Sequence, residues 1–446
     1  KRMAGTRIPK FIALFLLLIA FADVKAQQSR KLTLQEAISM GLQNSKQLKL
    51  SQAKIDEAVS RFNQVKDKAL PTSNAAFMYN HAEIPTTDFK ISANSDAIHL
   101  PRRSDAFIGT FSLQEVVFAG NKLRYAKEST DLLTKVARLD ADHDKEEIAY
   151  TIADNYINLY RLEQSRRIVN LNLEDIATQI KQADQFFKQG IITKNEVLRF
   201  QLQRSNIELT GLDIETNSKI VNYNLALLLG LPENTTIVVD EQLAIAAPQT
   251  PSEIVKAALT NRTEIKSLEL QGQSAVNNIK SIKADLSPTV LVGTNMYYIN
   301  PSGNFIPDAN RFIAPVTVGA TVAWNIDRLW TNKNKVAEAQ IQRSKVDLSR
   351  DVVSDQIKSQ VNQDYQSYTR SLARVKILEA TIEQARENNR ILESKYKNNV
   401  ASATDRIDAE TQLYQSLTNL ELAKADATLA YYTLLKSSGT ITQSSN

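Results

Sequence analysis

Apolar residues recur at helical spacing along two long tracts of the chain. In the second tract they step by four, three, four and three residues, the seam spacing of a coiled coil, at Val361, Tyr365, Tyr368, Leu372 and Val375. Proline, which costs about 3 kcal/mol inside a helix, is absent from residues 102–231 and from 316 onward. The pattern therefore predicts very long helices, and one over 123–187 would be about 100 Å long at ~1.5 Å per residue. Such a helix needs a coiled-coil partner or a place in the wall of an elongated tube.

Alternation of apolar and polar residues predicts four strands, over about residues 73–80, 106–117, 289–299 and 314–325. A loop containing Pro, Asn, Ser and Asp joins the members of each pair. Strands of about ten residues with this alternation and with aromatic residues near their ends are typical of a transmembrane β-sheet. A pair of soluble hairpins fits the alternation alone equally well.

The two halves of the chain match each other. Glu36 matches Glu253 at an offset of 217 residues, and Tyr156 matches Tyr365 at an offset of 209. The offset drops by eight residues between the strands of the two halves. We therefore expect most of the difference in length between the halves to fall in the exposed loop, where insertions are tolerated. Each half is therefore predicted to contain a helix, a strand, a loop, a strand, a very long helix, a tight turn and a helix.

The repeat sets the predicted domain organisation. Residues 27–231 form the first repeat, 252–446 the second, and 232–251 a connector. Residues 1–26 have the basic start, the 12-residue apolar run and the small-residue cleavage site of a secretory signal peptide, although a short N-terminal anchor is the alternative. The chain has a formal charge of +5, but residues 1–26 carry five basic residues and one acidic residue, so the remainder is near +1. Its basic character therefore gives no reason to expect nucleic-acid binding.

Composition excludes several kinds of chemistry. The chain has no cysteine, so disulfides, thiolate metal sites and cysteine nucleophiles are ruled out. It has three histidines and no H-E-x-x-H, P-loop or G-x-S-x-G motif. We therefore expect no catalytic site, no metal site and no cofactor, and we interpret the many carboxylate pairs on helices as solvated faces.

Four strands restrict the architecture further. They cannot close a barrel, and an open sheet edge cannot face lipid. A chain that inserts four strands into a membrane must therefore associate with other copies until the sheet closes. The helices are too polar to enter lipid, so they would continue the tube in water.

Three segments resemble the TolC-like family of outer-membrane efflux proteins. They are residues 32–38 (LTLQEAI) with Asn44, residues 112–122 at a strand-to-helix crossing, and residues 396–409 at a helical turn. Their order, spacing and duplication make the resemblance specific, and it covers about residues 32–442.

The resemblance implies a mostly α-helical fold with transmembrane β-structure. In this family a homotrimer forms a 12-stranded β-barrel in outer-membrane lipid, continued by a long α-helical barrel through the periplasm of a Gram-negative cell. The implied function is a passive exit duct of a tripartite efflux or type I secretion system, for drugs, other small molecules or proteins. The implied partners are a periplasmic adaptor and an inner-membrane transporter of the RND or ABC type.

The two helix–helix turns have local signals of their own. Gly190 suits a left-handed helix end, with Thr193 or Asn195 as the next cap. The second turn lacks glycine, so Asn398 or Asn399 is expected to adopt that geometry, followed by a cap at Ser402 or Thr404. The resemblance implies that these tips contact the adaptor through Gly190, Ile191, Ile192, Asn399 and Val400. Without it, they are helical hairpin turns and no more.

The resemblance also places Asp405 and Asp408 in a ring of aspartates at the narrow periplasmic entrance, with Tyr396 in the same constriction. The two aspartates are three residues apart and share one helix face. Three chains would bring their carboxylates together, which would raise some pKa values and attract cations. Ala401 stands where the family often has arginine, so the bonds that close this gate must differ. The alternative is that the aspartates only interact with the dipole of the helix they begin.

Four aromatic residues are predicted at the membrane interface. They lie near the ends of the last two strands, at Tyr297, Tyr298, Trp324 and Trp330. Tryptophan is favoured at the level of the lipid headgroups, and core packing is the alternative.

Two other classes of protein remain open at this point. A secreted coiled-coil scaffold with soluble β-hairpins would also explain the helical tracts and the alternating segments. An envelope hydrolase is disfavoured by the missing motifs. Extraction with detergent as trimers separates the duct from the scaffold.

Overall fold

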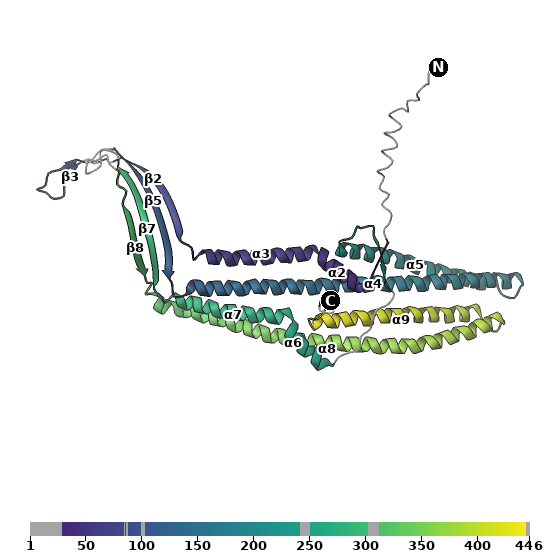
Figure 1. The fold of residues 1–446 in the computed structure, drawn as a ribbon. Coiled ribbons are helices and arrows are strands. Elements are labelled where there is room, and N and C mark those ends of the chain that lie inside the picture. Colours follow the sequence, from purple (N-terminus) through teal and green to yellow (C-terminus); the bar gives the residue numbers. More distant parts are fainter. Residues whose placement is uncertain are drawn as a thin grey trace, which may run out of the picture. The chain divides into compact units, whose positions relative to one another are not determined.

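A computed structural model describes residues 29–83, 85, 88–99, 103–240, 250–301 and 312–442 of the chain. The predicted signal peptide, residues 1–26, lies outside the described residues. The chain forms two compact units (Figure 1). The first unit comprises Lys1–Lys49, Asp144–Arg262 and Ile357–Asn446, and the second comprises Leu50–His143 and Thr263–Gln356.

Long helices dominate the described residues, and no described helix is both long and apolar enough to cross a membrane. The elements in chain order are β1 (Ser29–Leu32), α2 (Leu34–Asn44), α3 (Lys46–Asp67), β2 (Thr72–Glu83), β3 (Asp88–Phe89), β4 (Ile98–His99), β5 (Arg103–Phe118), α4 (Lys122–Lys188), α5 (Lys194–Leu229), β6 (Thr236–Val239), α6 (Pro251–Asn261), α7 (Thr263–Ala284), β7 (Thr289–Pro301), β8 (Val316–Ala323), α8 (Arg328–Lys397) and α9 (Ala403–Ser437).

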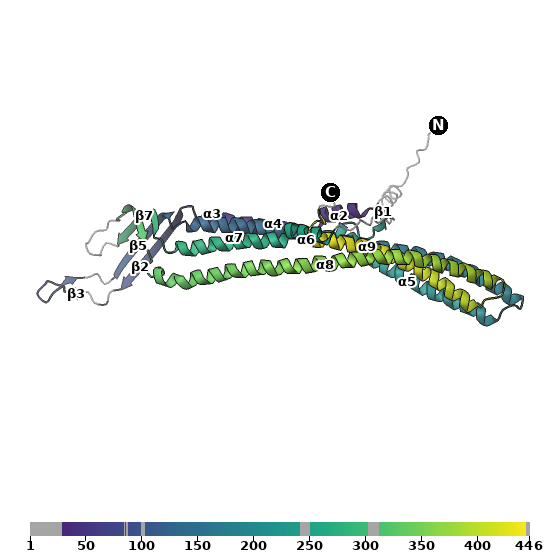
Figure 2. The ribbon, with the colours of Figure 1, turned by 90° about the horizontal axis from the view of Figure 1, so that it is seen from below.

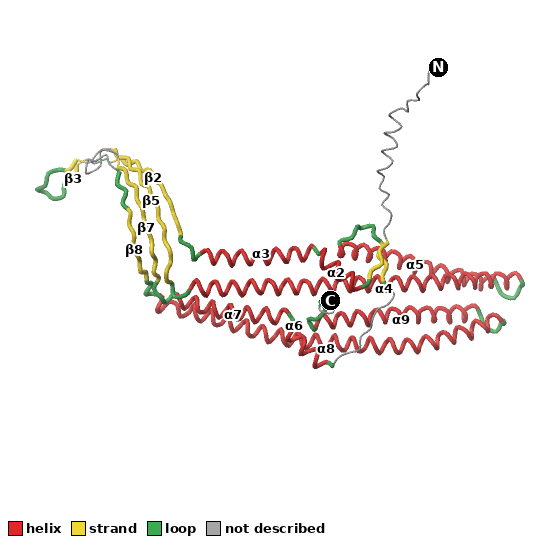
Figure 3. The backbone as a smooth tube through the Cα atoms, in the orientation of Figure 1, coloured by secondary structure: helices red, strands yellow, loops and turns green. Residues whose placement is uncertain are grey.

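The second unit contains the large sheet. Its four strands pair antiparallel in the order β2-β5-β7-β8, so β2 and β8 are its two edges (Figure 3). All four strands fall where the alternation predicted them, although β2 and β5 are longer than expected and β8 is shorter. The short pair β3 and β4, within the loop between β2 and β5, was not predicted.

The strands meet the helices of this unit at a cluster of polar contacts. Asp285, just after α7, accepts a hydrogen bond from Lys122 Nζ at 2.6 Å and forms an ion pair with Arg328 at 3.3 Å. The indole N–H of Trp324 donates to the carbonyl oxygen of Leu286 at 3.1 Å. These contacts join the starts of α4 and α8 to the end of α7.

The first unit packs α2, α4, α5 and α9 around an apolar core. The short strands β1 and β6 pair in parallel beside these helices. Tyr156 of α4 is fully buried, and its hydroxyl donates to the carbonyl of Leu32 at 2.7 Å and accepts from the N–H of Asp240 at 2.8 Å. This hydroxyl therefore ties both strands to α4.

The first helix of each half is two helices rather than the single one predicted. The chain leaves helical geometry at Ser45 and again at Arg262, where ψ is 119° and 126°. The two shorter helices α2 and α6 begin with the same device, a capping box of Thr33 with Glu36 and of Thr250 with Glu253. The residue that ends each is neither glycine nor proline, so the break carries no strong signal in the sequence.

Gly230 ends α5 in a conformation that a side chain would strain, which generates a stability prediction. Its φ is 70°, and a Cβ atom there would lie 2.8 Å from the Cβ of Asn44, whose amide donates to the Leu229 carbonyl. We expect Gly230→Ala to lower the free energy of unfolding by about 2 kcal/mol or more, since left-handed geometry alone costs a non-glycine residue about 1–2 kcal/mol. Chemical denaturation in detergent, followed by circular dichroism, measures it.

Gly272→Ala is the matched control. Gly272 lies inside α7, and a Cβ there would only reach ordinary contact at 3.9 Å. Alanine is the better helix former by about 1 kcal/mol, so this variant should be unchanged or more stable. Equal losses in both variants would contradict the explanation for Gly230.

Candidate functional site

The turn between α4 and α5 has the geometry that its glycine predicts. Gly190 has a φ of 74°, and the N–H of Ile191 donates to the Phe186 carbonyl at 2.9 Å. This is the six-to-one bond of a left-handed helix end. Thr193 precedes α5 as its N-cap, but its side chain makes no capping hydrogen bond.

The turn between α8 and α9 repeats this geometry without glycine. Asn399 has a φ of 57°, and the N–H of Val400 donates to the Lys395 carbonyl at 2.8 Å. Ser402 is the cap, and it forms a capping box with Asp405. Figures 1 and 2 both place the two turns at the same end of the first unit.

The five predicted tip residues differ in what they present to solvent. Val400 is 73% exposed and Ile191 is 44% exposed, so an apolar side chain projects from each turn. Ile192 instead packs against the buried cluster beneath the turns. Gly190 and Asn399 supply backbone geometry and are exposed. A contact at the tips would therefore be made by Ile191 and Val400 rather than by Ile192.

The three predicted gate residues lie in two different environments. Tyr396 is only 4% exposed, with its ring 6.0 Å from that of Phe186 and 5.7 Å from that of Phe200. Burial raises the pKa of Tyr396 to about 12. Asp405 and Asp408 are both exposed on α9. A single chain therefore does not bring the tyrosine hydroxyl into the aspartate cluster.

Asp405 is engaged by its own helix. Its carboxylate accepts hydrogen bonds from the hydroxyl of Ser402 at 2.7 Å and from the backbone N–H of that residue at 3.0 Å. These bonds lower the pKa of Asp405 below its ordinary value. Within one chain the direction is opposite to the rise expected for a ring of aspartates, because capping bonds stabilise the charged form.

A buried polar cluster beneath the turns was missed by the sequence interpretation. Glu410 and Gln179 are buried and hydrogen-bonded to each other, and Tyr414 donates its hydroxyl proton to Asp175. We had interpreted helical carboxylates as solvated, and for Glu410 that was wrong. Its burial arises because α9 packs against α4, which lies more than 200 positions away in the sequence.

The large sheet presents one apolar face, and its strand register defines it. Residues directly opposite in an antiparallel pair point to the same side. The apolar face therefore carries Phe77, Tyr79, Phe107, Phe111, Leu113, Val292, Met296, Tyr298, Val316, Val318 and Val322. All of these side chains are exposed, up to 79% for Val318, so no described part of the chain covers this face.

The opposite, polar face of the sheet has a different composition. It carries uncharged polar residues interspersed with small or apolar ones, among them Asn74, Thr110, Ser112, Gln114, Asn295, Thr317 and Thr321. None of the residues that the described strands place on this face is charged. The charges of these strands lie on the apolar side. At the far end of β2 and β5, His81 pairs with Asp105 at 2.6 Å and Arg103 with Glu83 at 3.1 Å, and Glu115 lies opposite Val292 near the other end of β5.

The predicted interface aromatics divide between these faces. Tyr297 and Tyr298 are neighbours in β7, so they point to opposite sides of the sheet. Tyr298 lies opposite Gly109 on the apolar face, whereas Tyr297 lies opposite Thr110 on the polar face. Only Tyr298 of this pair can therefore belong to a belt on the apolar face. Trp324 and Trp330 are exposed near the strand-to-helix crossing.

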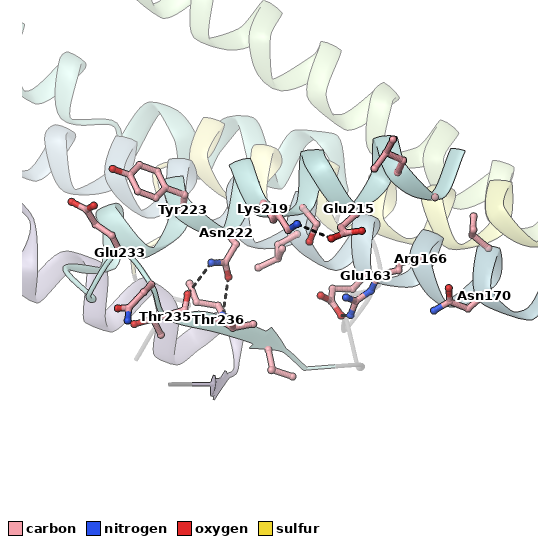
Figure 4. Close-up of a pocket in the computed structure, with 18 of the residues that line it drawn as sticks. Glu163, Arg166, Asn170, Glu215, Lys219, Asn222, Tyr223, Glu233, Thr235 and Thr236 are labelled. Carbon is pink, nitrogen blue, oxygen red and sulfur yellow. Dashed lines mark hydrogen bonds and ion pairs between the residues drawn. The ribbon is translucent and has the colours of Figure 1, made fainter. Parts of the chain in front are cut away.

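A groove of about 800 Å³ runs between α4, α5 and β6 in the first unit (Figure 4). Four of its charged residues pair with each other, Lys219 with Glu215 at 2.6 Å and Arg166 with Glu163 at 3.1 Å. Asn222 bonds the backbone of β6 and the segment before it. No set of three residues suited to hold a metal ion occurs among the residues that the structure describes. The groove thus offers paired charges rather than a set of groups aimed at one point.

Comparison with known proteins gives matches of one kind. Residues 254–440 match the family model described as outer membrane efflux protein. The chain is 21% identical over 418 residues to the outer membrane efflux protein BepC of Brucella suis biovar 1 (strain 1330), covering 92% of this chain and 86% of that one. It is 26% identical over 239 residues to the pyoverdine export outer membrane protein OpmQ of Pseudomonas putida, covering 48% of this chain and 49% of that one.

The fold has solved counterparts as well. The crystal structure of the outer membrane protein VceC of Vibrio cholerae superposes with a TM-score of 0.75 at 16% identity, covering 91% of this chain and 96% of that one. These matches confirm that the chain is related to the outer membrane efflux proteins, as its motifs predicted. They also confirm the predicted outer-membrane localisation, and the relatives are efflux channels rather than enzymes.

Proposed function

We propose that this chain is one subunit of a homotrimeric channel that serves as a passive exit duct from the periplasm to the cell exterior. The observation that carries the proposal is the uncovered apolar face of a sheet whose edges, β2 and β8, have no partner strand in the described chain. An apolar face of this extent fits lipid, and its charged far end fits the headgroup region. A soluble scaffold leaves this face in contact with water.

The open edges call for further copies of the chain. Unpaired backbone N–H and C=O groups each cost several kcal/mol in hydrocarbon, so β8 of one copy must pair with β2 of the next. Three copies would supply the 12 strands of a closed barrel. The number three comes from the family resemblance, and the need for closure comes from the sheet itself. The polar, uncharged face would line the duct.

Helix α5 supports association outside the membrane as well. One side of it is buried within the first unit, through residues that include Val197, Phe200 and Leu229. A second apolar stripe is exposed, at Leu198, Leu202, Leu209, Leu212, Ile220, Tyr223 and Leu227. A helix that is apolar on two sides belongs between two layers. We propose that a neighbouring subunit covers this stripe and so extends the duct as a helical barrel.

The partners follow from this position in the cell. The apolar tips at Ile191 and Val400 would dock a periplasmic adaptor protein, and an inner-membrane transporter of the RND or ABC type would supply the energy. The cargo would be drugs, other small molecules or proteins. OpmQ, which is named for pyoverdine export, favours a small molecule.

Neighbouring residues on opposite faces of β5 test the membrane assignment. We expect Phe111→Lys to block stable insertion, because lysine on a lipid-facing strand costs about 2–4 kcal/mol near the bilayer midplane in each subunit. Ser112→Lys, the matched control, should insert normally because its side chain would face the duct. Outer-membrane fractionation with heat-modifiable mobility measures both. Equal insertion of the two variants would contradict the assignment of faces.

The exposed stripe of α5 tests the subunit contact. Leu202→Glu with Leu209→Glu should shift the detergent-solubilised protein from trimer towards monomer, since each buried leucine contributes about 1.5–3 kcal/mol. Asn217→Glu, at an exposed position on the polar side of the same helix, is the control and should stay trimeric. Light scattering after size exclusion gives the mass. A trimer that survives the double substitution would show that this stripe is not the interface.

The gate assignment has its own test. Asp405→Asn with Asp408→Asn should weaken block of the channel by multivalent cations in planar bilayers, because the ring would lose its negative charge. Asparagine is used since its side-chain oxygen keeps the capping bond to the start of α9. Asp355→Asn, on α8 rather than on α9, is the control. Unchanged block in the double variant would remove these aspartates from the gate.

A further inference from the structure

One carboxyl group lies in the interior beneath the two turns. Glu410 of α9 is 3% exposed and Gln179 of α4 is 4% exposed. The amide nitrogen Nε2 of Gln179 donates a hydrogen bond to Oε2 of Glu410. This bond joins the first long helical tract to the last helix of the chain.

Each of these two side chains also carries a second oxygen or its only oxygen, Oε1, that has no hydrogen-bond partner among the described residues. Oε1 of Glu410 and Oε1 of Gln179 are both buried, and neither accepts a hydrogen bond from the described residues. Leaving a buried acceptor unsatisfied costs about 1–3 kcal/mol. Two acceptors cannot bond to each other, so no rotation of these side chains satisfies both oxygens while the carboxyl is ionised.

A single proton resolves both deficits. A protonated carboxyl has one O–H donor, and a proton on Oε1 of Glu410 can be donated to Oε1 of Gln179. The acid and the amide are then joined by two parallel hydrogen bonds. Both orphaned atoms then have a hydrogen-bond partner.

The surrounding charges leave Glu410 without an ion-pair partner. The Arg406 guanidinium donates its hydrogen bond to Asn389 of α8, and Tyr414 of α9 donates to Asp175 of α4. Burial raises the pKa of Glu410; the Gln179 bond and Arg406 oppose this rise, and the nearby carboxylates Asp175 and Glu393 add to it.

We propose that Glu410 is a proton-binding residue that, paired with Gln179, fastens α4 to α9 beneath the turns while it is protonated and releases them when it ionises. Because the pKa of Glu410 is raised above its ordinary 4.5, the stabilisation is complete below that value. It is lost as pH rises through the pKa of the folded state. If the proposed duct opens by separation of these helices, opening becomes more frequent as pH rises.

Three variants of the full chain separate the proton from the packing. Glu410→Gln replaces the acid by an amide that can make the same two bonds without a proton. Gln179→Leu removes the pairing, and the exchange Gln179→Glu with Glu410→Gln restores an acid–amide pair in reverse. Glu383→Gln on α8, where the side chain is 70% exposed, is the control.

Infrared spectroscopy of the detergent-solubilised protein from acidic to neutral pH tests the proton directly, because a raised pKa keeps this carboxyl protonated above its ordinary 4.5. We expect a carbonyl band of a protonated carboxylic acid that Glu410→Gln removes, the exchange retains and Glu383→Gln leaves unchanged. Unfolding should show a stability loss with rising pH in the wild type and in the exchange variant, but not in Glu410→Gln. Absence of the band in the wild type, or one pH profile for wild type and Glu410→Gln, would overturn the proposal.

Planar bilayers test the consequence for conduction. If the pKa of Glu410 is higher by one in the closed than in the open state, each subunit should increase the ratio of open to closed channels about tenfold between low and high pH. Glu410→Gln should abolish this dependence, and a dependence that persists in it would contradict the opening step. Absence of any conductance would contradict the proposed duct, whereas the proton site is decided by the spectrum and the unfolding profile.

Discussion

The open sheet is the constraint on which the rest of this molecule depends. Four antiparallel strands expose one face of aromatic and aliphatic side chains, and the strands at either edge have no partner in the described chain. Exposing the apolar face to water is unfavourable, and so is exposing the unpaired N–H and C=O groups of the edge strands to lipid. Lipid on one side and further copies of the same strands at both edges satisfy these requirements together. The proposed assembly meets both requirements at once.

The same incompleteness recurs in the helices. The inner side of α5 is covered by its own unit, while its outer side carries a second row of apolar residues. Both elements are thus incomplete within the described chain. The edges of the sheet lack hydrogen-bond partners, and α5 lacks a packing layer on its outer side. In the proposed trimer, association would therefore stabilise both the sheet and the helices.

Local pattern predicted what local forces determine. The alternation of apolar and polar residues predicted the four strands, and the absence of proline predicted the two longest helices. Gly190 predicted the turn in which it lies. The breaks in the helices at Ser45 and Arg262 were not predicted, because neither residue is a helix breaker. The pairing of β1 with β6 joins segments about 200 positions apart, so no window of sequence contains it. The opposite faces of Tyr297 and Tyr298 could have been predicted, because neighbours in a strand always diverge. The burial of Glu410 could not, since it is created by α4.

The location of that carboxyl suits the proposed duct, which would be tight in one state and open in another. An apolar pair at the same place would hold α4 and α9 together at every pH, because hydrophobic contact has no titratable component. A salt bridge would hold them most firmly where both groups are charged. An acid paired with an amide has neither property: it is strong while protonated, and ionisation sets a buried charge against an unpaired amide oxygen. In the proposed mechanism, loss of one proton from Glu410 weakens the contact between α4 and α9. The apolar cluster of Tyr396, Phe186 and Phe200 keeps the turns themselves folded.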